Sequence, residues 1–198
     1  MSHAKNLEPG GATVADLLAI PEERRRHEVI DGELVEKKAA TPGHGVAQGA
    51  VVSSLRPPFS RKPGGPRGPG GWWFATDTEV TFGPHQIFRP DVLGWRRERV
   101  AKMPEDFATD VIPDWVCEIL STNRGDDLVK KFRAYHQARV AHYWVLDPLD
   151  STLTVYRWQE SGYFVAQRAE RGEKLRPEPF DALELEVGVL FGDDESEP

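Results

Sequence analysis

The sequence has little cysteine and no long apolar run. Cys117 is the single cysteine in 198 residues, which excludes an intramolecular disulfide and a zinc site built from cysteines. No apolar stretch approaches the roughly 18 residues that a membrane helix needs. Residues 1–11 also contain no apolar segment of the kind found in signal peptides. We therefore expect a cytoplasmic protein with no membrane partner.

Familiar catalytic motifs are also missing. The sequence contains no GxSxG elbow, no HExxH motif, no kinase motif set and no GxxxxGK[ST] phosphate loop. Positive charge is scarce, because 25 basic residues stand against 32 acidic ones and the net charge is −7. A protein that coats nucleic acid by charge alone needs many Lys and Arg contacts to phosphates, so this balance argues against that mode. An enzyme that holds a metal between carboxylates and touches a few phosphates remains compatible with it.

Length and composition predict one domain. A chain of 198 residues, 39% hydrophobic and with six Trp, can bury a sizeable core. We expect a flexible N-terminus over 1–12, a single domain over 13–191 and an acidic tail over 192–198. The segment 61–71 is rich in Gly and Pro and is expected to be a loop within the domain.

Local patterns predict an irregular mixture of helices and strands. Two alternating runs around Asp31-Gly32 predict a β-hairpin over 27–38. A helix over 44–56 should end at Pro57-Pro58. Two further helices are predicted, a short one that begins at Thr13 and another over 126–138. The other predicted strands cover 72–82, 87–95, 114–120, 142–148, 152–158, 162–168 and a short segment near 183–187. This order is typical of an α+β fold with a mixed sheet, not of regular βαβ alternation.

Two acidic residues interrupt apolar strands. Asp91 follows Pro90 within IFRPDVLGW, and Glu118 lies within DWVCEIL. An ionised carboxylate in an apolar strand is costly unless it is paired or bound to a metal. If the two strands are neighbours, Asp91 and Glu118 can share one divalent cation, and Mg²⁺ or Mn²⁺ prefers such oxygen ligands. The alternative is that these acids lie at strand ends or pair with Arg89 or Lys131.

Lys131 lies on the helix predicted over 126–138, four residues after Asp127. The two side chains share a helix face, so a surface ion pair is one interpretation. The other is that the Lys131 ammonium reaches back to the two carboxylates, where it would stabilise negative charge on a phosphate.

The order of these segments resembles the Uma-two family of restriction-endonuclease-like proteins, within the PD-(D/E)XK nuclease superfamily. The resemblance covers about residues 13–190. Its most specific part runs from Pro113 to Pro148, where EILS, Asp-x-x-x-Lys-x-x-x-Tyr and Tyr-Trp-x-x-Asp-Pro follow one another. The resemblance implies an α/β/α restriction-endonuclease-like core, in which helices flank a mixed sheet. It also implies the activity of a Mg²⁺- or Mn²⁺-dependent endonuclease that hydrolyses phosphodiester bonds of DNA.

The resemblance also implies roles for single residues. Asp91 in Pro90-Asp91 and Glu118 match the two acidic metal ligands, and the backbone carbonyl of Ile119 would be the third ligand. His44 matches a histidine at the head of the second helix, which would assist proton transfer or complete the metal shell.

The lysine and a further acid are less directly matched. The superfamily usually has lysine two residues after the second acid, and Leu120 stands there in this sequence. The resemblance therefore implies Lys131 of the following helix, with Lys130 as the weaker choice. Glu33 matches an N-terminal acid near the site, with Glu28 as the weaker choice.

Two functions remain open at this level. The set of Asp91, Glu118 and Lys131 favours an active endonuclease, with DNA preferred over RNA as substrate. The net charge of −7 and the absence of a broad basic surface favour an inactive nuclease-fold module that binds or regulates. A homodimer would suit cleavage of both strands of a duplex, because it would carry two sites.

Overall fold

The structure, a computed structural model, describes residues 11–65, 68–121 and 125–194. A six-stranded sheet in the order β10-β9-β8-β7-β6-β3 forms its centre. Its strands are β3 (Trp72–Thr76), β6 (Val92–Arg96), β7 (Trp115–Ile119), β8 (His142–Asp147), β9 (Thr152–Gln159) and β10 (Gly162–Glu170). Strands β7 and β8 pair in parallel and the other neighbours pair antiparallel, so the sheet is mixed, as predicted.

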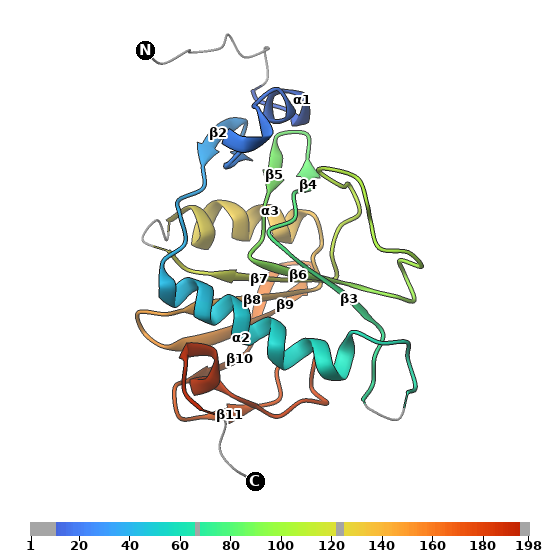
Figure 1. Cartoon of the computed structure of the whole chain (residues 1–198), viewed down its shortest axis with the longest axis vertical. Helices are drawn as coiled ribbons and strands as arrows, with labels where there is room; N and C mark the ends of the chain where they lie inside the picture. Colours follow the sequence, from blue (N-terminus) through green and yellow to red (C-terminus); the bar gives the residue numbers. More distant parts are fainter. Residues whose placement is uncertain (1–10, 66–67, 122–124, 195–198) are drawn as a thin grey trace.

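Helices cover both faces of this sheet (Figure 1). The helical segments are α1 (Val14–Leu18), η1 (Glu22–Arg24), α2 (Pro42–Phe59), the π-helical turn η2 (Asp126–Lys131), α3 (Phe132–Gln137) and η3 (Val187–Phe191). Leu55 of α2 and Cys117 of β7 belong to the core on one face, and Tyr135 of α3 belongs to the core on the other. Because neighbouring residues of a strand point to opposite faces, Glu118 points toward α3. The predicted α+β fold with flanking helices is confirmed.

A second sheet lies beside one end of the first (Figure 1). It is antiparallel, in the order β2-β1-β5-β4. Its strands are β1 (His27–Ile30), β2 (Glu33–Glu36), β4 (Val80–Gly83) and β5 (Gln86–Phe88), and a separate small pair joins β11 (Lys174–Leu175) to β12 (Leu185–Glu186). The β1–β2 hairpin turns at Asp31 and Gly32, both with positive φ, so the hairpin prediction is confirmed.

Two strand predictions are wrong in an informative way. The segments 72–82 and 87–95 each divide into two strands that join different sheets, β3 and β4 in the first case and β5 and β6 in the second. The first break lies at Asp77, where φ is +49°. The second lies at Pro90, which has no N–H to donate to a ladder. Asp91 therefore stands where the chain passes from the small sheet to the large one.

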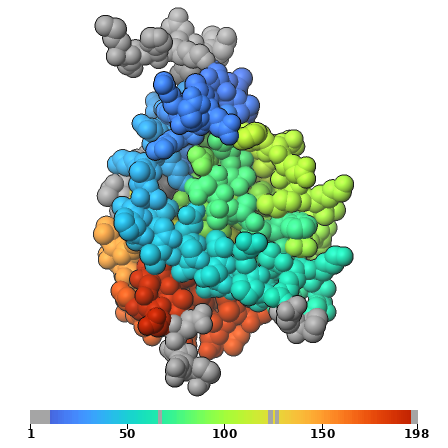
Figure 2. Space-filling model, viewed as in Figure 1, coloured from blue at the N-terminus to red at the C-terminus, as the bar shows by residue number. Residues whose placement is uncertain are grey.

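The end of α2 also differs from the prediction. The helix continues through Pro57 and Pro58 to Phe59. The Phe59 side chain is buried, with its ring centroid 4.9 Å from that of Phe180, so packing holds the last turn despite the missing proline donors. The C-terminal segment lies against α2 (Figure 2).

The chain ends follow the predictions only in part. Ala12 is buried and its N–H donates to the Gly32 carbonyl at 2.7 Å, so the predicted loose N-terminus stops before Ala12. Residues 1–10 and 195–198 lie outside the described part of the chain. The extent of the single domain over 13–191 stays a prediction. Residues 61–65 and 68–71 form neither helix nor strand, in line with the predicted loop. Within the described segments, no helix is long and apolar enough to cross a membrane.

His142, the first residue of β8, should make folding sensitive to acid. Burial, together with the charges of Arg96 and Arg157, lowers its pKa from 6.5 to about 4. Between pH 6.5 and 4 the unfolded chain therefore binds a proton that the folded chain does not, and the free energy of unfolding should fall as the pH falls through this window. Urea unfolding at several pH values should show a shallower dependence for His142→Gln than for the wild type. Equal dependence in both proteins would contradict this assignment.

Candidate active site

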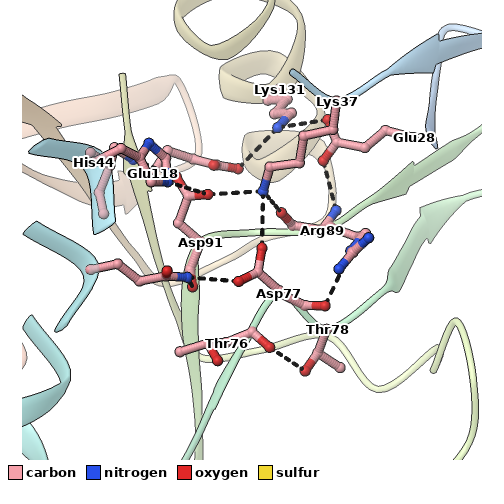
Figure 3. Close-up of polar contacts among 12 residues, drawn as sticks. Glu28, Lys37, His44, Thr76, Asp77, Thr78, Arg89, Asp91, Glu118 and Lys131 are labelled. Atoms are coloured by element: carbon pink, nitrogen blue, oxygen red, sulfur yellow. Dashed lines mark hydrogen bonds and ion pairs between the residues drawn. The ribbon is translucent and has the colours of Figure 1, made fainter. Parts of the chain in front are cut away.

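A cavity of about 490 Å³ opens where the two sheets meet. The sequence-predicted residues His44, Asp91, Glu118, Ile119 and Lys131 all line it. They come from α2, the start of β6, β7 and η2, so the fold gathers side chains that are far apart in the sequence. Figure 3 shows how His44, Asp91, Glu118 and Lys131 lie relative to one another.

Asp91 and Glu118 lie on neighbouring strands. Strands β6 and β7 pair Val92 with Cys117, and continuing this antiparallel register by one residue sets Asp91 opposite Glu118. Each residue is 2% exposed. The N–H of Ile119 donates to Asp91 Oδ2 at 2.8 Å, which ties the Asp91 carboxylate to β7 at the start of its own strand.

Two basic side chains approach the other oxygen of Asp91. Lys37 Nζ donates to Oδ1 at 2.8 Å, and His44 Nε2 lies 3.2 Å from the same oxygen. Burial by itself would raise the pKa of Asp91, but the His44 hydrogen bond and the Lys37 charge outweigh it and hold this pKa well below its usual range. Asp91 is therefore ionised at neutral pH. His44 is positioned by the first turn of α2, where its N–H donates to Thr41 Oγ1 at 3.2 Å.

Glu118 is held from the side of α3. Lys131 Nζ lies 3.4 Å from Glu118 Oε1 and 3.0 Å from Glu28 Oε2, and the Tyr135 hydroxyl donates to Glu118 Oε1. Burial raises the pKa of Tyr135 well above its usual value, and the Glu118 charge raises it further, so this hydroxyl keeps its proton. Lys131 itself is 2% exposed. Its ammonium thus bridges two buried carboxylates, and the interpretation of Lys131 as a surface residue is wrong. Lys131 lines the cavity and Lys130 does not.

The structure corrects the choice between the two N-terminal acids. Glu33 is exposed, lies beside the hairpin turn and is not among the cavity-lining residues. Glu28 lies at the other end of the hairpin, is 4% exposed and lines the cavity. Its Oε1 accepts the N–H of Arg89 at 2.7 Å. The hairpin register explains the difference, because Glu33 pairs with Ile30 next to the turn whereas Glu28 pairs with Val35 further along.

Comparison with known proteins identifies the family of this chain. The model of the Uma2 family, described as "putative restriction endonuclease", matches residues 14–188. The chain belongs to the Uma2 family. A crystal structure of a "putative nuclease belonging to DUF820" from Anabaena variabilis ATCC 29413 is similar in fold, with a TM-score of 0.68 and 22% sequence identity, over 91% of this chain and 97% of that one. No match is found among curated proteins.

In this Uma2 chain, Lys37 is a site residue that the sequence analysis missed. Besides Asp91, its ammonium donates to the Arg89 carbonyl at 2.6 Å and lies 3.5 Å from Asp77 Oδ1. Burial alone would lower the pKa of Lys37, but the nearby charges of Asp91 and Glu118 raise it above its usual value. In the sequence, Lys37 is one of two adjacent lysines at the end of a strand, a pattern typical of a solvated surface. No local signal distinguishes it.

In this Uma2 site, lysine ammonium groups face the two acids that were predicted to bind a metal. In the parts of the chain that the structure describes, no three His, Cys, Asp or Glu side chains gather in an arrangement that could hold a metal ion. Asp91 and Glu118 instead face ammonium groups, Lys37 in one case and Lys131 in the other. His44 Nδ1 is buried and has no hydrogen-bond partner within the described residues.

Proposed function

We propose that this protein is an endonuclease that uses Mg²⁺ or Mn²⁺ to hydrolyse phosphodiester bonds of DNA, with its active site in this cavity. The observation that carries the proposal is the burial of Asp91 and Glu118 on neighbouring strands, with the Lys131 ammonium beside Glu118. Burying two carboxylates and an ammonium costs stability. A functional role for the three groups explains why the protein carries this cost. Membership of the Uma2 family adds independent support for a nuclease.

The donor set fits the proposed metal. Mg²⁺ binds through one or two carboxylates and keeps several waters, so Asp91, Glu118 and the carbonyl of Ile119 would suffice to hold it. His44 could add a nitrogen ligand to Mn²⁺ through Nε2, the ring atom that faces Asp91. The metal would lower the pKa of a coordinated water and polarise the phosphate.

The remaining residues would position and neutralise charge. Lys131, fixed between Glu28 and Glu118, presents an ammonium that would offset negative charge developing on the phosphate. Tyr135 and Glu28 are positioning residues, since they hold Glu118 and Lys131 in place. Glu33, which was predicted to lie near the site, is not among the cavity-lining residues, whereas Glu28 is, so we assign the place of the N-terminal acid to Glu28.

The test is cleavage of supercoiled plasmid by the full chain with Mg²⁺, with Mn²⁺ and with EDTA. We expect nicked and linear plasmid only when a metal is present. Parallel reactions with single-stranded DNA and with RNA define the substrate class, and we expect the rates on DNA to exceed the rate on RNA. If the protein hydrolyses none of these substrates with either metal, the proposal is overturned.

The second candidate is a catalytically inactive nuclease-fold module that binds or regulates. It is favoured by the pairing of both carboxylates with lysines and by the net charge of −7. Binding of DNA without hydrolysis under every metal condition would support it. The homodimer stays a prediction, which sedimentation of the protein with and without DNA would decide.

A further inference from the structure

Both oxygens of the Asp91 carboxylate already have partners. Oδ2 accepts the N–H of Ile119 at 2.8 Å, and Oδ1 accepts from Lys37 at 2.8 Å with His44 3.2 Å away. A metal that binds Oδ1 of Asp91 must therefore compete with Lys37 or His44 for a lone pair. Lys37 is the competitor that carries a full positive charge.

Lys37 Nζ lies in a position suited to a cation. The oxygens around it come from Asp91, from the backbone of Arg89 and from Asp77, at 2.8, 2.6 and 3.5 Å. Two are carboxylate oxygens and one is a carbonyl oxygen, the donor types that Mg²⁺ and Mn²⁺ also take. Figure 3 shows the ammonium at the meeting point of these three groups.

The two lysines of the site differ in how they are enclosed. The Lys131 side chain is 3% exposed and bridges two buried carboxylates. The Lys37 side chain is 21% exposed and follows the end of β2. Four rotatable side-chain bonds allow its ammonium to move while the backbone stays fixed, and the Lys37 N–H is held by the Arg26 carbonyl at 2.7 Å. Lys37 can therefore leave Asp91 without unfolding the site.

We propose that Lys37 competes with a divalent ion for Oδ1 of Asp91, leaves this oxygen when the ion binds, and then pairs with a phosphate oxygen of the substrate. Without metal, Lys37 neutralises a buried carboxylate that would otherwise be costly. When the ion arrives, repulsion between two adjacent cations drives the ammonium toward the opening of the cavity. The pairing with phosphate rests on the proposed nuclease function, whereas the exchange on Asp91 does not.

The exchange is tested by Mn²⁺ titration of the full chain without nucleic acid, with free Mn²⁺ followed by electron paramagnetic resonance. Lys37→Met should bind Mn²⁺ about tenfold more tightly than the wild type, because the competing ammonium is gone. Lys102→Met removes the same charge from an exposed residue outside the cavity and should bind like the wild type. Lys37→Gln serves as the second variant if Lys37→Met does not fold. Unchanged or weaker Mn²⁺ affinity in the folded Lys37 variant would overturn the exchange.

The phosphate contact is tested by binding of a fluorescent DNA oligonucleotide with Ca²⁺ in place of Mg²⁺. Lys37→Met should bind about tenfold more weakly than Lys102→Met, since one charge-assisted contact is lost. Equal affinities would overturn this contact. If the wild type binds no oligonucleotide, the proposed function and the phosphate contact fail together, while the Mn²⁺ titration still decides the exchange on Asp91.

Discussion

Asp91→Asn should reduce metal-dependent cleavage of plasmid DNA by about three orders of magnitude. The substitution keeps the shape of the side chain and retains an oxygen that can accept the Ile119 N–H. It removes the negative charge that a divalent ion needs and that Lys37 and His44 now face. Initial rates of loss of supercoiled plasmid at a fixed Mg²⁺ concentration measure the effect.

Asp110→Asn is the matched control for this experiment. Asp110 is exposed and does not line the cavity, so the same chemical change there should leave the cleavage rate within about twofold of the wild type. Thermal unfolding of both variants shows whether they are folded under the assay conditions. A folded Asp91→Asn variant that cleaves at the wild-type rate would place the metal elsewhere, or would attribute the observed cleavage to a contaminant.

Lys131→Met should destabilise the protein by about 3 kcal/mol. Methionine fills much of the lysine volume but removes the ammonium between Glu28 and Glu118, and both carboxylates remain 2–4% exposed. Because a buried carboxylate that loses its cation must either stay ionised at high cost or take up a proton, folding becomes less favourable at neutral pH. Urea unfolding measured at pH 7 gives the change in the free energy of unfolding.

The double variant Glu28→Gln/Lys131→Met distinguishes charge from packing. It removes one of the two carboxylates along with the ammonium, so it should be more stable than Lys131→Met alone. Lys102→Met, an exposed lysine, should change the free energy of unfolding by less than about 0.5 kcal/mol. A double variant less stable than Lys131→Met would show that the lysine contributes through packing and not through its charge.

Features that depend on neighbours in the sequence are the ones that sequence analysis predicted well. The hairpin follows from Asp31-Gly32, which tolerate the positive φ values of a tight turn. Asp91 and Glu118 could be predicted as site residues because a charge within an apolar strand needs a compensating partner. The partners could be named only in part, since Lys131 was one of two candidate partners and Lys37 was not considered.

Features that depend on the meeting of distant segments were missed. Residues that favour strands lie on both sides of Asp77, so nothing local indicates that the chain there passes from one sheet to another. Glu28 and Lys37 enter the cavity only because the hairpin sheet lies against the start of β6, and Glu33, in a more familiar motif, stays outside it. The prolines of α2 mislead for the same reason, because the burial of Phe59 outweighs the local preference for a helix end.

Because the chain passes between two sheets at Asp77 and at Pro90, the residues of the site come from two different sheets. Glu118 lies in the central sheet and Asp91 directly precedes β6 of that sheet. Glu28 and Lys37, which set the charge around these acids, lie in the hairpin sheet and in the segment just after β2. Changes in the hairpin can therefore alter the electrostatic environment of the acids while the strands that carry them keep their packing. Substitutions in the hairpin, whether natural or engineered, could therefore adjust which cation the site prefers without changes to the core.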